Sequence, residues 1–189
     1  MKNIFLSFRP EYFRPILYGI KKYEYRKRFC NEATTAFLYM SSPIQEVIGV
    51  MKLEKPIITT SIINNYSSNS EIFKRIERCI ENRELFAIPI ISFKLFKTPV
   101  SINNIKEIKP NFFVPQCYLN IEKHQEVFNY LKKQDMFDIE FFHNHESIYE
   151  DNFGLMCVEM EKTEEFLRKD IQYANDKKYS IVKCKYLTK

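Results

Sequence analysis

The chain has 189 residues and a formal net charge of +5, with 45% hydrophobic residues, 17 phenylalanines, 12 tyrosines and no tryptophan. This length and apolar content are typical of one large globular domain, with or without an extension. The five cysteines form no CxxC pair, which argues against a disulfide framework or a zinc site, and no apolar run approaches the roughly 18 residues of a membrane span. We therefore expect a soluble, cytoplasmic protein that binds no membrane and uses no cofactor.

The two ends of the chain differ in charge. Residues 1–135 carry 21 basic and 13 acidic side chains, a balance of +8, whereas residues 136–189 carry 8 basic and 11 acidic, a balance of −3. We predict a main domain at 1–135 and a C-terminal α/β extension at 136–189 that packs on the same domain. A polyanion would bind to the first part.

Hydrophobic periodicity, caps and turn residues predict the following elements. In the first half they are a strand at 4–8, a helix at 10–17 that Pro15 kinks or divides and Gly19 ends, a charged strand from Lys22 to about Cys30, strands at 36–40 and 45–57 with a bulge or close contact at Gly49, and a loop with a helical turn at 59–69. A helix capped by Ser70, a strand at 85–100 interrupted by Pro89, a short helix at 104–108, an irregular connector at 109–116 and a helix from Asn120 to about Lys133 follow. The extension is expected to contain an alternating stretch at 137–141, a turn at 151–154, a strand at 155–160, a helix at 163–174 and a last strand at 180–187.

The most distinctive stretch runs from Lys21 to Arg28, where five basic residues and one acidic residue give a local balance of +4. Period-two alternation places Lys22, Glu24, Arg26 and Arg28 on one face of the predicted strand. Because a strand fixes the spacing of its side chains, this density of cations suits an anionic ligand.

This stretch and four others resemble the ASCH domain, a branch of the PUA-like superfamily. The motif G-x-K-x-x-E-x-R is found at Gly19, Lys21, Glu24 and Arg26. The supporting stretches, in order, are Leu6 to Pro10, Tyr39 to Pro43, Val47 to Gly49 and Val114 to Gln116. The resemblance covers roughly residues 1–135 and implies an α+β fold, a PUA-like mixed β-barrel flanked by helices, with a cleft beside the motif.

The resemblance also implies a function, because the superfamily binds RNA, often at modified or flipped bases. We expect RNA or a modified nucleotide to bind in a basic cleft beside the motif. The candidate ligand-binding residues are Arg9, Lys21, Lys22, Glu24, Arg26, Tyr39, Ser41 and Ser42, with Lys27 and Arg28 as a nucleic-acid rim. The aromatic residues Tyr39, Phe112, Phe113 and Tyr118 could stack on a base or pack in the core.

Other functions stay open. Some ASCH-like members are hydrolases, either amidohydrolases on acylated cytidines or ribonucleases, and here Lys21 and Glu24 would be the catalytic acid/base pair. The amidohydrolase branch has a threonine where this chain has Glu24, so the presumed nucleophile is missing. Glu24 could also form only a structural ion pair, and the chain could be a protein-interaction domain. A metal site at His143, His145 and Glu146 lacks further ligands at a recognisable spacing, so we expect no metal.

Overall fold

The computed structural model describes residues 2–148 and 151–175. Within them, eight strands form one sheet in the order β2-β6-β4-β3-β1-β7, and β5 and β8 each pair with β6. The strands are β1 (Lys2–Phe8), β2 (Tyr23–Arg26), β3 (Thr34–Met40), β4 (Glu46–Leu53), β5 (Ile57–Ile58), β6 (Phe86–Ser101), β7 (Tyr118–Asn120) and β8 (Met136–Phe142). The fold is therefore a mixed α+β fold built on a curled, half-barrel sheet.

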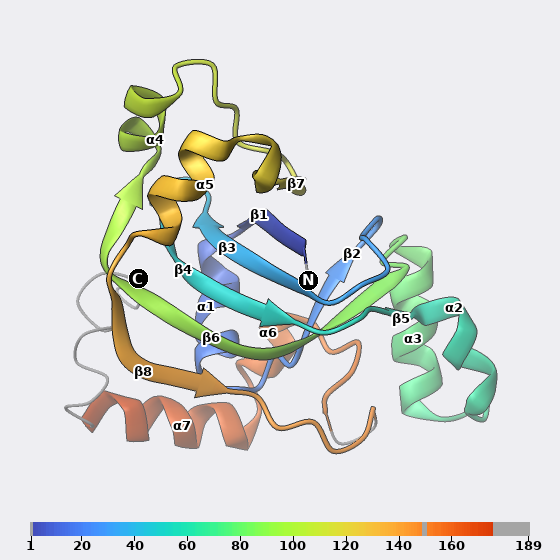
Figure 1. Ribbon diagram of the computed structural model, residues 1–189. Coiled ribbons are helices and arrows are strands. Elements are labelled where there is room, and N and C mark those ends of the chain that lie inside the picture. Colours follow the sequence, from blue (N-terminus) through green and yellow to red (C-terminus); the bar gives the residue numbers. More distant parts are fainter. Residues whose placement is uncertain (1, 149–150, 176–189) are drawn as a thin grey trace.

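Seven α-helices surround the sheet in the described part of the chain. They are α1 (Phe13–Leu17), α2 (Thr59–Ile62), α3 (Glu71–Glu81), α4 (Ile102–Ile108), α5 (Gln125–Lys132), α6 (Cys157–Met160) and α7 (Glu164–Asn175), with short 3-10 helices η1 (Pro10–Tyr12), η2 (Ile63–Asn65) and η3 (Ile121–Lys123). Figure 1 shows α4 and α5 at one end of the curled sheet, α2 and α3 at the other, and α7 running alongside β8. None of these helices is long and apolar enough to cross a membrane.

Strands β4 and β6 approach each other closely at Gly49. The pairing of β4 with both β3 and β6 shifts register between Val47 and Gly49, as in a β-bulge. A Cβ atom at Gly49 would lie 2.1 Å from the carbonyl oxygen of Lys94 in β6, so only glycine fits there. This confirms the bulge and close contact expected at this position.

Two large apolar clusters lie on opposite faces of the sheet because side chains alternate along each strand. Ile4 and Leu6 of β1 belong to the cluster that α1 covers, whereas Phe5 belongs to the cluster that α4 and α5 cover. A third cluster joins β2 to α3 through Tyr23 and also contains Phe153 from the C-terminal region. The start of β2 is therefore enclosed by segments that are distant in the sequence.

Several predicted elements are confirmed. Ser70 caps α3, and its side chain accepts a hydrogen bond from the backbone of Phe73. The segment after Pro10 divides into η1 and α1, as Pro15 suggested. The helix near the end of the chain is α7, whose first turn is capped by the Thr163 hydroxyl. The strand expected at 180–187 lies outside the described residues.

The prediction that Pro89 interrupts its strand was wrong, because β6 runs unbroken for 16 residues. Pro89 lies opposite Tyr23 of β2, and the next residue, Ile90, is the first that pairs with β4. Ile90 donates its backbone N–H to the Lys22 carbonyl, on the side of β6 that faces β2. Because successive N–H groups alternate along a strand, an N–H at position 89 would point to the opposite side, beyond the end of β4. No ladder hydrogen bond is lost there.

The expectations for two other segments were also inaccurate. Residues 155–160 form no strand but the helical turn α6, which begins because the carboxylate of Glu159 accepts a hydrogen bond from the backbone of Met156. The helix expected from Asn120 begins later, since Asn120 caps η3 and α5 starts at Gln125. The charged strand is also shorter than expected and ends at Arg26.

Candidate functional site: a buried ion cluster at the start of β2

Gly19 places the motif on the sheet. It has a φ of +69°, the left-handed conformation that favours glycine after a helix, and it ends the helical segment that contains α1. The next two backbone amides, those of Ile20 and Lys21, both donate to the carbonyl oxygen of Pro15. The turn is thereby closed, and Lys21 is delivered to the start of β2.

The three charged motif residues form one cluster. The Lys21 Nζ lies 3.6 Å from one carboxylate oxygen of Glu24, and the Arg26 guanidinium lies 2.8 Å from the other. All three side chains are largely buried, with exposed fractions of 7% for Lys21, 9% for Glu24 and 13% for Arg26. The Glu24 carboxylate is therefore paired with two cations in a largely buried environment, and each of its oxygens contacts one of them.

Backbone and aromatic groups complete the surroundings of Lys21. Its Nζ donates to the carbonyl oxygen of Tyr23 at 2.8 Å and lies 5.0 Å from the ring centroid of Tyr25 and 5.6 Å from that of Tyr12. Ring faces attract cations, and this attraction is stronger where water is excluded. Lys21 is thus fixed in position rather than free to follow a mobile ligand.

Arg26 connects the cluster to two other parts of the chain. Its guanidinium donates to the carbonyl oxygen of Ser7 in β1 at 2.6 Å and to the sulfur of Cys117 at 3.5 Å. The Ser7 hydroxyl in turn donates to the carbonyl oxygen of Pro115. The first strand, the motif and the connector after α4 therefore meet at Arg26.

The electrostatics of the cluster keep its charges in place. Burial lowers the pKa of Arg26, but the nearby charge of Glu24 outweighs burial and the net pKa is raised, so Arg26 stays charged. Burial raises the pKa of the Cys79 thiol to about 12 and also raises that of Cys157, so both thiols stay protonated at neutral pH. Neither cysteine is therefore activated as a nucleophile.

Glu84 is a further carboxylate at this site that the sequence did not indicate. Burial raises its pKa, and the charge of Glu24 acts in the same direction, while Lys21 opposes both. Glu84 lies just before β6, which pairs with β2, so the sheet rather than a local motif brings it to the cluster. The site therefore holds two carboxyl groups in different environments.

Comparison with known structures identifies the fold. Two crystal structures of single-substitution variants of the protein ZmASCH from Zymomonas mobilis resemble this chain. The first has a TM-score of 0.53 and 24% identity and covers 71% of this chain and 97% of the other; the second has a TM-score of 0.51 and 21% identity and covers 71% and 100%. The chain has an ASCH-like fold. No protein-family model and no curated protein matches the sequence.

The ASCH-like fold brings together only part of the predicted ligand-binding set. Lys21, Glu24 and Arg26 meet, but Lys22 turns away from them and forms an ion pair with Asp151 at 2.8 Å. The ring of Tyr39 is 5% exposed and stacks on Phe5 within the core cluster under α4 and α5. Tyr39 is therefore a core residue.

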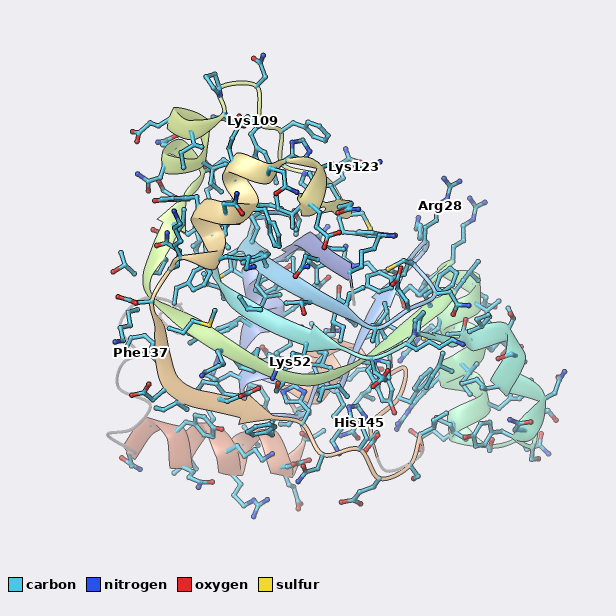
Figure 2. All side chains as sticks on the ribbon, in the orientation of Figure 1. Arg28, Lys52, Lys109, Lys123, Phe137 and His145 are labelled. Carbon is cyan, nitrogen blue, oxygen red and sulfur yellow. The ribbon has the colours of Figure 1, made fainter. Side chains whose placement is uncertain are left out.

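The exposed or half-buried members of the predicted set lie just beyond the ends of strands. Lys27 and Arg28 follow β2, are exposed and form no ion pair with a described residue, and Figure 2 shows Arg28 projecting from the molecule. Arg9 follows β1 and is 70% exposed, with Glu11 at 3.6 Å. Ser41 and Ser42 follow β3, beside the end of β1, because the backbone of Ser41 donates to the Phe8 carbonyl.

The aromatic candidates are divided between core and surface. Phe112 is 2% exposed and packs on Phe5 and His124, and the half-buried Tyr118 packs on Phe29. Phe113 is 64% exposed. Of the residues proposed to stack on a base, Phe113 is the most accessible.

The residue that fixes the C-terminal region to the motif strand is Asp151, which the sequence suggested only as part of a turn. Its side chain is 1% exposed and accepts hydrogen bonds from Lys22, the Tyr23 hydroxyl and the backbone of Glu146, with His145 at 3.0 Å. Burial alone would raise the pKa of Asp151, but the hydrogen bond from Lys22 and the other donors outweigh burial and the pKa is lowered. Asp151 therefore remains a carboxylate.

The two histidines of the hypothetical metal site are separated by their partners. His145 contacts Asp151 and the Ile90 carbonyl through its two ring nitrogens, whereas His143 packs edge-on against Phe93. No group of three or more potential metal-ligating side chains gathers within residues 2–148 and 151–175.

Proposed function

We propose that this protein binds RNA or a modified nucleotide along β2, with exposed cations contacting the phosphates and the buried cluster holding the strand in shape. The proposal is supported by the ASCH-like fold and by the balance of +4 between Lys21 and Arg28. Cations that contact phosphates provide most of the affinity for nucleic acid, and they do so without reading sequence.

The observation that carries the proposal is the contrast between the two parts of this stretch. Lys21 and Arg26 are buried and already paired with Glu24, so they can offer little new charge to a ligand. Lys27 and Arg28 are exposed and form no ion pair with a described residue. A phosphate that approaches the end of β2 would meet the latter pair first, so we assign the phosphate contacts to them and a positioning role to the cluster.

A binding assay with a matched control tests this assignment. Labelled single-stranded and duplex RNA would be titrated with the parent protein, with the double variant Lys27→Ala/Arg28→Ala, and with the control Lys132→Ala/Lys133→Ala. The control removes the same charge from two adjacent exposed lysines at the end of α5. We expect the first variant to bind RNA about tenfold more weakly and the control to bind like the parent. An equal loss of RNA affinity in both variants would refute the assignment of the phosphate contacts to Lys27 and Arg28.

A second candidate is a hydrolase that acts on a nucleoside or RNA, and Glu84 favours it. Sites that separate an acid from a base often hold two carboxyl groups in different environments, and here the raised pKa of Glu84 contrasts with the cation-paired Glu24. Lys21 forms an ion pair with Glu24, and its charge opposes the rise in the pKa of Glu84. In a hydrolase, Lys21 would then contact the substrate.

Product formation distinguishes the two candidates. The protein would be incubated with labelled RNA and with an acylated cytidine, and cleavage or deacylation would be followed. Product that disappears in Lys21→Ala and in Glu84→Gln would establish the hydrolase. A salt-sensitive shift of RNA without product would support binding alone, and no response to any probe would favour a protein-interaction domain.

A further inference from the structure

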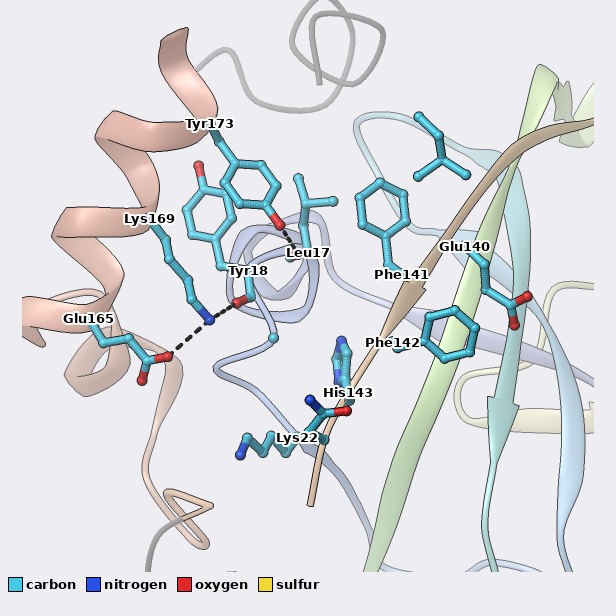
Figure 3. A pocket seen from close by; sticks show the side chains of 13 residues that line it. Leu17, Tyr18, Lys22, Glu140, Phe141, Phe142, His143, Glu165, Lys169 and Tyr173 are labelled. Atoms are coloured by element: carbon cyan, nitrogen blue, oxygen red, sulfur yellow. Dashed lines mark hydrogen bonds and ion pairs between the residues drawn. The ribbon is translucent and has the colours of Figure 1, made fainter. Parts of the chain in front are cut away.

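A cavity of about 300 Å³ lies between β8, α7 and the turn that follows α1. The residues that line it include Tyr18, Lys22, Phe142, His143 and Lys169, as seen in Figure 3. Lys21, Glu24 and Arg26 are not among the lining residues, so this cavity is distinct from the ion cluster. Its volume is at the lower end of the range for small-molecule sites.

His143 is the feature that suggests a ligand. Its side chain is 6% exposed and lines the cavity, and neither ring nitrogen makes a hydrogen bond of good geometry with a described residue. The backbone of Ile16 lies close enough to the ring to oppose in part the effect of burial on its pKa, but it leaves at least one ring nitrogen without a partner among the described residues. Buried polar atoms in native proteins nearly always have a partner, and leaving one without a partner is costly. Burial lowers the pKa of His143 to about 4, so at neutral pH the ring is uncharged and has one N–H donor and one acceptor nitrogen. A bound molecule could satisfy it.

The charges around the cavity are already balanced. Lys22 pairs with Asp151, and Lys169 pairs with Glu165 at 2.9 Å and donates to the Tyr18 carbonyl at 2.6 Å. An ammonium group has three N–H donors, so both lysines can still donate to a neutral acceptor. The lining therefore favours an uncharged ligand with carbonyl or ring-nitrogen acceptors over an anion.

The strand that forms one wall adds backbone groups and a ring. β6 is the only described strand that pairs with β8. His143 donates its backbone N–H to the carbonyl oxygen of Ile91 in β6, so by alternation the backbone groups of Phe142 face away from β6. The ring of Phe142 is 68% exposed and lies at the rim of the cavity (Figure 3), where it offers a face for stacking.

We propose that this cavity binds a planar, uncharged heterocycle with carbonyl and N–H groups on its edge, the chemistry of a nucleobase. His143 hydrogen-bonds the edge of the ring, Lys22 and Lys169 donate to its acceptors, and Phe142 stacks on its face. Much of the cavity wall comes from β8 and α7, so the C-terminal region has a binding function of its own. The inference does not depend on phosphate contacts at Lys27 and Arg28.

NMR of the histidine rings tests the proposal directly, because the chain has only three histidines. Uridine, cytidine, adenosine and guanosine would be added separately to the full-length protein, with signals assigned from single variants. We expect at least one nucleoside to shift the His143 signal saturably and to leave His124, which packs on Phe112, unchanged. No His143 shift with any of the four would overturn the proposal, and so would an equal shift with ribose 5-phosphate, which has no base.

Variants show whether the shift reports binding in the cavity. His143→Phe should weaken nucleoside binding about tenfold, measured by calorimetry, because it removes both ring nitrogens. Phe142→Ala changes an exposed side chain, so it keeps the test valid if His143→Phe does not fold, and it should weaken binding by a stacking contribution. Unchanged affinity in Phe142→Ala and in a folded His143→Phe would refute the site. The Lys27→Ala/Arg28→Ala variant should bind nucleoside normally, so failure of the RNA proposal can be told apart from failure of this one.

Discussion

Replacing Asp151 by alanine should destabilise the protein strongly. The substitution removes the partner of Lys22, whose side chain is 16% exposed, together with hydrogen bonds at 2.8 Å to Lys22, 2.9 Å to the Tyr23 hydroxyl and 3.1 Å to the backbone of Glu146. Removing one partner of a buried ion pair costs about 3–5 kcal/mol, because the other charge remains buried without compensation. For a domain of ordinary stability this is a large part of the total free energy of unfolding.

Urea unfolding of the parent and of two variants measures this cost. Asp138→Ala is the matched control, because Asp138 is an exposed aspartate on β8. We expect Asp151→Ala to lower the free energy of unfolding by about 3–5 kcal/mol and the control to change it by less than about 0.5 kcal/mol. A cost below about 1 kcal/mol for Asp151→Ala would refute the view that this carboxylate holds the C-terminal region on β2.

Two further perturbations test the fold and the cavity. Gly49→Ala should prevent folding or destabilise the protein by about 3 kcal/mol or more, measured by thermal unfolding, because the new methyl would overlap the Lys94 carbonyl at 2.1 Å; a variant as stable as the parent would contradict the close approach. Burial lowers the pKa of His143 to about 4, so between about pH 4 and 6.5 the unfolded state binds a proton that the folded state does not. The contribution of the neutral His143 ring to the free energy of unfolding is therefore full above about pH 6.5 and is lost as the pH falls to about 4. The loss should approach about 3 kcal/mol and should be absent from His143→Phe, as pH-dependent urea unfolding would show; an identical pH dependence in both proteins would contradict a neutral buried ring.

The sequence predicted the parts of the fold that depend on local signals. Gly19 and Ser70 mark a helix end and a helix start through backbone conformation and capping, and both act over a few residues. The bulge at Gly49 was also predicted, because glycine within a strand commonly marks one. Pro89 misled the prediction, since whether a proline breaks a strand depends on which neighbouring strand its missing N–H would face.

The site was predictable only in part for the same reason. The spacing of Lys21, Glu24 and Arg26 indicated a cluster, but its burial depends on segments that pack over it from far along the chain. Glu84 reaches the cluster through the pairing of β6 with β2, and Asp151 reaches Lys22 across 129 positions. No local pattern reports such long-range contacts.

The salt dependence of RNA binding tests the central proposal most directly. For single-stranded RNA, each phosphate contact adds about 0.7 to the slope of log affinity against log salt concentration. If Lys27 and Arg28 contact phosphates, Lys27→Ala/Arg28→Ala should reduce that slope by about 1.4, and Lys132→Ala/Lys133→Ala should leave it unchanged. An unchanged slope in the first variant, or the same reduction in both, would contradict an RNA-binding site at the end of β2.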